Sequence, residues 1–171
     1  DTDFALLQNV AWAEKLVARW EKKCGEDAVE IPLSVAGRAV KEERPLRECL
    51  DPSRPGVVVG RYRQANEQDI NDAIDCAKAD DDGWRSMPHQ ERAEVLGRVA
   101  HELRCARADL MGAAMAEGGK TLLESDPEVS EAIDFVEFYT QTAGFYHELE
   151  GVQASAQGVV VVVSPWNFPI A

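Results

Sequence analysis

The chain has 171 residues, of which 45% are hydrophobic and 29% are charged. This size and composition are typical of a globular domain with a core large enough to fold without disulfides, and they exclude a collagenous or disordered chain. Asp and Glu outnumber Lys and Arg by 31 to 18, which gives a net charge of -13. Because such a surface repels phosphate backbones and anionic lipids, we expect neither nucleic-acid binding nor membrane-surface binding.

The ends of the chain and its cysteines indicate a cellular location. No apolar stretch is long enough to span a bilayer, and the first residues form no secretory leader and lack an initiator Met. We therefore expect a cytoplasmic chain that is cut from a longer polypeptide. The four cysteines show neither CxxC spacing nor a nearby histidine at metal-ligand spacing, so we expect free thiols and no metal site. Cys76 and Cys105 fall in helical patterns beside alanines, where we expect buried side chains.

Hydrophobic periodicity predicts five helices and two early strands. The first helix is an amphipathic segment, Asn66 is an N-cap for the second, and Gly118 and Gly119 end the fourth. Asp126 followed by Pro127 predicts the start of the last and longest helix. The predicted helices cover residues 4–22, 67–78, 88–106, 109–116 and 126–151. The predicted strands lie within residues 29–37 and 56–65, joined by a charged, Pro-rich connection.

The five valines from Val159 to Val163 predict a further strand. Their continuous apolar character is typical of a strand buried on both faces in a parallel sheet. Such a strand needs neighbours, and few other segments could supply them, so we expect the rest of the sheet to lie outside these residues. In open α/β sheets, ligands bind beyond the carboxyl ends of the strands. The hexapeptide from Ser164 to Pro169 is therefore the candidate site.

Common catalytic signatures are absent: the sequence holds no GxGxxG, no GxxxxGK[ST], no GxSxG and no HExxH. The three histidines, His89, His101 and His147, are scattered, and we expect them to face solvent or cap helices. The aspartates 80–82 are expected to form a solvated helix end, and Lys120 an exposed cation at a helix end. These residues favour no specific chemistry.

The segment VVVVVSPWNFPIA resembles the aldehyde dehydrogenase superfamily, where a buried cofactor-domain strand ends in a PWNFP turn. AEGGKTLLESDPEVSEAIDFVEFYTQTA is similar to a helix region of the L-glutamate γ-semialdehyde (Δ1-pyrroline-5-carboxylate) dehydrogenase branch. The opening helix, with the following IPL, RECLDPSRPG and VVGRYRQA, resembles the junction before this module in bifunctional proline utilization A proteins. The resemblance covers essentially the whole chain.

The resemblance implies an α/β parent with a doubly wound sheet, of which this chain is a mostly α-helical fragment with a few strands. Residues 1–28 would be a connector or arm helix, and residues 29–171 the incomplete N-terminal part of an NAD-binding domain. The parent would oxidise L-glutamate γ-semialdehyde to L-glutamate with NAD, as a homo-oligomer. FAD is implied only if a proline dehydrogenase module precedes residue 1. None of the four cysteines lies in the family's nucleophile context, so we expect the fragment alone to be inactive.

The resemblance also assigns site residues. Asn167 would aim its amide at the oxyanion formed when a thiolate attacks the aldehyde. Residues beside the cofactor would be Ser164, Pro165 and Trp166, and those beside the substrate Phe168 and Glu131.

Several alternatives remain open at this point. A turn asparagine bonding its own backbone would also explain Asn167, core packing would explain Trp166, and a solvated carboxylate would explain Glu131. The choice between NAD and NADP is not determined. The chain could also belong to an aldehyde dehydrogenase with another substrate, or be a non-enzymatic helical adaptor or oligomerisation module.

Overall fold

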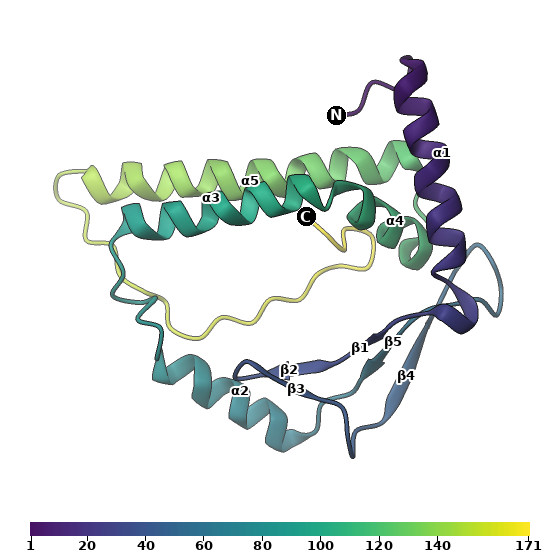
Figure 1. The fold of residues 1–171 in the computed structure, drawn as a ribbon. Helices are drawn as coiled ribbons and strands as arrows, with labels where there is room; N and C mark the ends of the chain where they lie inside the picture. Colours follow the sequence, from purple (N-terminus) through teal and green to yellow (C-terminus); the bar gives the residue numbers. More distant parts are fainter.

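A computed structural model describes all residues from 1 to 171 and arranges them in two layers. Figure 1 shows a helical layer above, a layer of strands with one helix below, and the C-terminal segment running between them. The prediction of a mainly helical chain with a few strands is confirmed. The helices of the upper layer are α1 (Leu7–Lys22), α3 (His89–Cys105), α4 (Arg107–Gly118) and α5 (Leu122–Glu148), and α2 (Glu67–Ala79) lies in the lower layer.

The hydrophobic core lies in the helical layer, where α1, α3, α4 and α5 meet. Trp20 of α1 lies directly on Gly112 of α4: a Cβ at position 112 would come within 2.0 Å of the indole ring. A glycine at this position therefore permits the close approach of the two helices. The five buried residues of the core cluster are Leu16, Ala100, Met111, Val129 and Ile133.

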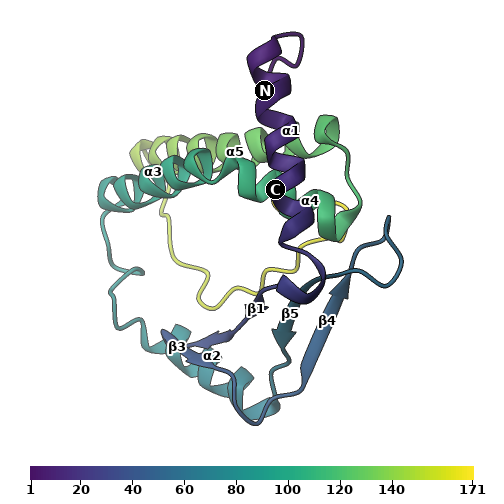
Figure 2. The same ribbon diagram turned by 45° about the vertical axis from the view of Figure 1, so that its right-hand side comes forward.

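The lower layer holds two small sheets. In the first, β5 (Val58–Arg63) lies between β1 (Glu30–Ile31), which is parallel to it, and β4 (Leu46–Leu50), which is antiparallel. The second is a hairpin of β2 (Leu33–Val35) and β3 (Arg38–Val40). Figure 2 shows α2 beside the hairpin, away from the helical layer.

The prediction of one strand within residues 29–37 is wrong. The segment forms two strands, β1 and β2, which belong to different sheets. Pro32 lies between them and has no N–H for a continuous ladder. Strand β4 lies in the stretch that the sequence predicted to be a connection. Its side chains are mostly exposed, and only pairing with β5 makes the segment a strand.

Helix α5 starts at Leu122 rather than at Asp126. The backbone N–H of Thr121 donates to Glu124 Oε2 over 2.8 Å, which completes a capping box at the true N-terminus. The helix continues through Pro127. The prediction was wrong because it read Asp126 as a cap, whereas this residue is buried inside the helix. None of the helices, α5 included, combines the length and the apolarity that a membrane span requires.

The predicted strand over Val159 to Val163 is not formed. These residues lie outside every helix and strand, and no hydrogen bond involves residues 153–164. Val161, Val162 and Val163 are each more than 80% exposed. A strand requires a hydrogen-bonded neighbour, and neither sheet of the lower layer reaches this segment.

The expectation of buried cysteines in helices is also wrong, since Cys76 and Cys105 are both exposed. Cys76 lies on α2, whose packing partner in this chain is the small hairpin. Cys105 is the last residue of α3, where the helix leaves the core. Helical spacing alone did not show which face each helix buries.

Candidate functional site

Residues 165–168 form a tight turn at the end of the chain. The backbone N–H of Phe168 donates to the carbonyl oxygen of Pro165 over 3.1 Å, so Trp166 and Asn167 lie at the tip of the turn. The side chain of Asn167 is exposed and makes no hydrogen bond within the chain. The amide is therefore not used to stabilise the turn, and its N–H groups are free to donate to another molecule.

A buried carboxylate anchors the residues that follow the turn. Glu128 of α5 accepts the backbone N–H of Ile170 over 2.7 Å and that of Ala171 over 3.3 Å, both at Oε1. Its other oxygen, Oε2, accepts a hydrogen bond from the ammonium group of Lys120. The exposed fraction is 1% for the Glu128 side chain and 12% for that of Lys120. A charge buried this deeply is stable only when it is paired and hydrogen-bonded, as Glu128 is here.

The expectation that Lys120 is an exposed cation is therefore wrong. Gly119 adopts a left-handed conformation at the end of α4, and α5 begins two residues after Lys120, at Leu122. This short connection folds the lysine back over the first turns of α5. Sequence reasoning also missed Glu128 as a functional residue. The signal available in the sequence was spacing: Glu128 lies three residues after Ser125 and four before Ala132, so it shares a helical face with two small residues. The structure buries both of them, and a carboxylate on that face needs a partner.

The same lysine contacts the aromatic ring in the turn. The ammonium nitrogen of Lys120 lies 4.9 Å from the centre of the Phe168 ring, a distance typical of a cation–π interaction. Phe168 as a residue remains 47% exposed. One face of Phe168 is therefore held by the ion pair, while the rest of its apolar surface is open to a ligand.

A hollow of about 490 Å³ opens beside the turn, between the end of α4 and the loop after β4. It brings together the three residues that the sequence assigned to the cofactor. Asn167, Phe168 and Glu131 do not line it. The lining residues are Pro52, Glu117, Gly118, Ser164, Pro165, Trp166 and Pro169.

The hollow can be tested against the dinucleotide that the resemblance implies. Trp166 is 83% exposed, so it is not packed in the core as the alternative reading held, and its ring offers a stacking surface. The carboxylate of Glu117 can accept hydrogen bonds from sugar hydroxyls. No basic side chain lines the hollow. The residues present therefore fit a ribose and an aromatic ring, and not the pyrophosphate.

Glu131 lies apart from this constellation. It is exposed on α5, and its side chain makes no hydrogen bond or ion pair within the chain. The structure does not bring it into the contacts of the turn. Its free carboxylate can bind a cationic group, but of the two predicted substrate residues only Phe168 belongs to the anchored turn.

A second buried carboxylate, Asp126, joins the N-terminus to α5 beside Glu128. The backbone N–H of Thr2 donates to it over 2.6 Å and the Nε of Arg107 over 2.9 Å. Burial raises the pKa of Asp126, but the hydrogen bonds from Thr2 and Arg107 outweigh this and hold the pKa below its usual value. Asp126 is therefore ionised and fully paired at neutral pH, which suits a structural role.

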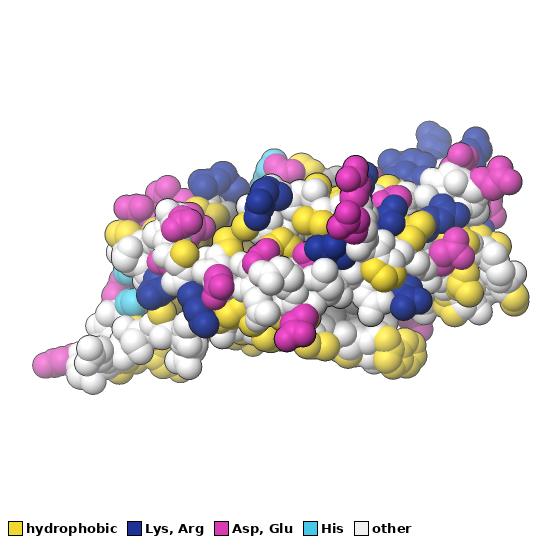
Figure 3. Space-filling view, turned by 90° about the horizontal axis from the view of Figure 1, so that it is seen from below, with side chains coloured by type: hydrophobic (Ala, Val, Ile, Leu, Met, Phe, Trp, Pro, Cys, Tyr) yellow, Lys and Arg dark blue, Asp and Glu magenta, His cyan; other side chains and the backbone are white.

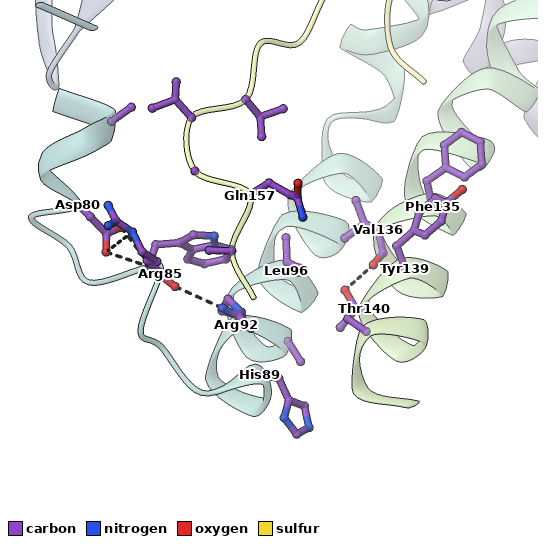
Figure 4. A pocket seen from close by; sticks show the side chains of 18 of the residues that line it. Asp80, Arg85, His89, Arg92, Leu96, Phe135, Val136, Tyr139, Thr140 and Gln157 are labelled. Atoms are coloured by element: carbon purple, nitrogen blue, oxygen red, sulfur yellow. Dashed lines mark hydrogen bonds and ion pairs between the residues drawn. The ribbon is translucent and has the colours of Figure 1, made fainter. Parts of the chain in front are cut away.

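The largest cavity lies elsewhere and contains none of the predicted site residues. It has a volume of about 990 Å³ between α3, α5, the segment before α3 and residues 156–160. Figure 4 shows Leu96, Val136 and Tyr139 on its wall and Gln157 of the C-terminal segment crossing it. Its main charged groups are engaged: Arg85 lies 3.9 Å from Asp80, and Arg92 donates to a backbone carbonyl oxygen. This cavity is an apolar packing surface, and the turn is the better candidate site.

The surface charge around these features is mixed. On the face seen from below, Lys and Arg are interspersed with Asp and Glu, and hydrophobic side chains lie between them (Figure 3). No basic patch dominates this face.

Comparison with known proteins identifies relatives of the chain. Residues 39–171 match the model of the aldehyde dehydrogenase family. The chain is 33% identical over 129 residues to the bifunctional protein PutA of Klebsiella aerogenes, which covers 75% of this chain and 10% of that protein. It is 30% identical over 180 residues to 1-pyrroline-5-carboxylate dehydrogenase 2 of Bacillus subtilis, covering 99% of this chain and 34% of the relative. The chain thus spans about a third of the length of that dehydrogenase.

Solved structures share the fold. Proline utilization A from Bdellovibrio bacteriovorus superposes with a TM-score of 0.88 at 22% identity, covering 99% of this chain and 18% of that one. A 1-pyrroline-5-carboxylate dehydrogenase from Thermus thermophilus gives 0.82 at 24% identity, covering 99% and 34%. A structure of the Thermus enzyme with bound NAD also gives 0.82 at 24% identity, with the same coverage of 99% and 34%. The two-layer arrangement of this chain is therefore that of one portion of these longer proteins.

Proposed function

We propose that this chain, which belongs to the aldehyde dehydrogenase family, is the N-terminal part of an NAD-dependent enzyme that oxidises L-glutamate γ-semialdehyde to L-glutamate. Relatives named 1-pyrroline-5-carboxylate dehydrogenase and PutA support this branch of the family. The helical-adaptor alternative is not favoured, because the match to an enzyme family extends over residues 39–171.

The observation that carries the proposal is the free amide of Asn167 at the tip of an anchored turn. An aldehyde oxygen becomes negatively charged when a nucleophile attacks the carbon. A donor that is already in place at that oxygen stabilises the charge without reorganisation. Because the neighbouring residues 170 and 171 are tied to Glu128, we infer that Asn167 is held ready for this role.

The cofactor proposed is NAD, which accepts a hydride when bound. Ser164, Pro165 and Trp166 would hold a ribose and a ring of the dinucleotide in the adjoining hollow. The phosphates would be bound by residues beyond this chain. FAD would be needed only by a proline dehydrogenase module preceding residue 1. We place the complete enzyme in the cytoplasm as a homo-oligomer.

For the substrate, the exposed surface of Phe168 would pack against the aliphatic carbons of the semialdehyde. The carboxylate of Glu131 would attract its amino group. An aldehyde dehydrogenase with another substrate would share Asn167 but have no use for Glu131. In the complete enzyme, Glu131→Ala should therefore lower kcat/KM for L-glutamate γ-semialdehyde and leave kcat/KM for propanal unchanged. Equal activity of wild type and variant on the semialdehyde would contradict the substrate assignment.

The role of Asn167 can be tested by steady-state kinetics on the complete enzyme. Asn167→Ala should lower kcat and kcat/KM together by about 100- to 1000-fold, with the Kd for NAD nearly unchanged. Asn167→Asp should be at least as impaired, because a carboxylate repels the oxyanion while keeping the turn propensity. Asn71→Ala, a substitution of an exposed asparagine on α2, is the matched control. Near-normal turnover of both Asn167 variants would remove this residue from the catalytic site.

A further inference from the structure

We propose that Glu128 is a positioning residue for catalysis, which acts by fixing the place of Asn167; this inference rests on the function proposed above. Glu128 lies in α5, far from Asn167 in the sequence, and does not contact its side chain. It accepts hydrogen bonds from the backbone N–H groups of Ile170 and Ala171, which lie three and four residues after Asn167. No hydrogen bond involves residues 153–164 on the other side of the turn. Glu128 is therefore the main polar anchor of the turn within this chain.

The charge of Glu128 is held by Lys120. The pair is almost fully buried, with exposed fractions of 12% for Lys120 and 1% for Glu128. One carboxylate oxygen faces the lysine and the other faces the two backbone donors. Each oxygen thus has a separate task, and the carboxylate cannot rotate without losing a partner. This geometry gives the turn a fixed position relative to α5.

The ion pair of Lys120 and Glu128 also contacts Phe168, the residue of the turn that is predicted to bind the substrate. Lys120 Nζ lies 4.9 Å from the centre of the Phe168 ring, so the ion pair contacts the turn at Phe168 as well as at residues 170 and 171. Asn167 directly precedes Phe168, inside the turn that the hydrogen bond from Phe168 N–H to the Pro165 carbonyl oxygen closes. A displacement of about 1 Å at a catalytic group can cost on the order of 100-fold in rate. Loss of the anchor should therefore reduce turnover by moving Asn167, without removing any group that contacts the substrate.

The test is a double-mutant cycle on the complete enzyme, with L-glutamate γ-semialdehyde and NAD as substrates. The variants are Glu128→Gln, Asn167→Ala and the double variant, with Glu148→Gln as a control on the exposed end of α5. Glutamine keeps the size of the side chain and one acceptor but loses the charge that binds Lys120. If Glu128 acts through Asn167, Glu128→Gln should lower kcat by at least about tenfold in the wild-type background. It should lower kcat by less than about twofold when Asn167 is already alanine.

A merely structural role gives a different result. The two effects on kcat would then multiply, and in both backgrounds the melting temperature would fall and the Kd for NAD would rise as activity is lost. Multiplied effects, or an unchanged kcat in Glu128→Gln, would overturn the inference while leaving the role of Asn167 intact. If Asn167→Ala alone retained normal turnover, the proposed role of Asn167 would fail and the inference with it. Melting curves and NAD titrations on all four variants separate these cases. If Glu128→Gln does not fold, Glu128→Asp replaces it in the same cycle, because the shorter side chain keeps the charge but withdraws the carboxylate from the backbone N–H groups of Ile170 and Ala171.

Discussion

Residues 159–163 and residues 170–171 belong to the same C-terminal segment, yet the structure treats them in opposite ways. The five valines are the most strongly apolar run in the sequence, and in this chain they make no hydrogen bond and remain largely exposed. Ile170 and Ala171 carry no obvious signal, and both donate their N–H groups to a buried carboxylate. Apolar character alone gave the valines no hydrogen-bonded partner in this chain, whereas one paired carboxylate binds the backbone at residues 170 and 171.

The difference follows from what each segment needs. A β-strand depends on N–H and C=O partners from a neighbouring strand, and the strands of this chain lie in another layer. The turn needs only one acceptor, and Glu128 is supplied by the nearby helix α5. The exposed valines form an apolar surface of the kind that marks an interface, which agrees with the proposal that further strands of a longer enzyme cover them.

The largest expected effect comes from breaking the anchor. Lys120→Met leaves the Glu128 carboxylate buried without its cation, and removal of one partner of a buried ion pair costs about 3–5 kcal/mol. We expect this loss in the free energy of unfolding, measured by urea denaturation of the 171-residue chain. Lys15→Met, which replaces an exposed lysine of α1, should change the free energy by less than about 0.5 kcal/mol. Equal stability of the two variants would show that the pair does not anchor the structure.

Hydrogen exchange compares the two segments directly. The Ile170 amide is hydrogen-bonded and the Val161 amide is not. After correction for intrinsic rates, we expect the Ile170 amide to exchange at least about tenfold more slowly than that of Val161. NMR or mass spectrometry of the wild-type chain measures both rates. Equal exchange rates would contradict the contrast between an anchored turn and a free valine run.

Acid titration extends the comparison to a paired carboxylate of the lower layer. Hydrogen bonds from the Arg44 side chain and from the Asn66 backbone lower the pKa of Asp69 from 3.8 to about 2. Because the folded-state pKa lies below the ordinary one, this group stabilises the fold above about pH 4 and loses that contribution as the pH falls towards 2. Asp69→Asn should remove this part of the pH dependence, measured by urea unfolding. Asp75→Asn, on the exposed face of α2, should retain it.

The smallest expected effect is at the valines. Val161→Asp introduces a charge at a side chain that is 82% exposed. The free energy of unfolding of the 171-residue chain should therefore change by less than about 0.5 kcal/mol. In the complete enzyme, where we propose that a sheet covers this run, the same substitution should be strongly destabilising. A large loss in the short chain would show that the valines are already packed.

Local patterns predicted the helices well. Asn66 and Asp69 form the capping box that opens α2, and Gly119 ends α4 in the left-handed conformation. The family resemblance carried by the PWNFP turn is confirmed by the match over residues 39–171. These features depend on residues close together in the chain, so a short stretch of sequence contains all the information needed. The same approach failed at α5, where two capping signals compete and Asp126 turned out to be a buried partner of Arg107.

The sequence by itself therefore determined most helix boundaries, the family and the position of the candidate turn. Only the tertiary structure decided that Lys120 is buried against Glu128, and that this carboxylate binds a backbone more than forty residues away. It also decided that the valine run is unpaired in this chain. The physical reason is that helix caps and turns are satisfied by neighbours in sequence, whereas strand pairing and buried charges are satisfied only by partners that folding brings from elsewhere.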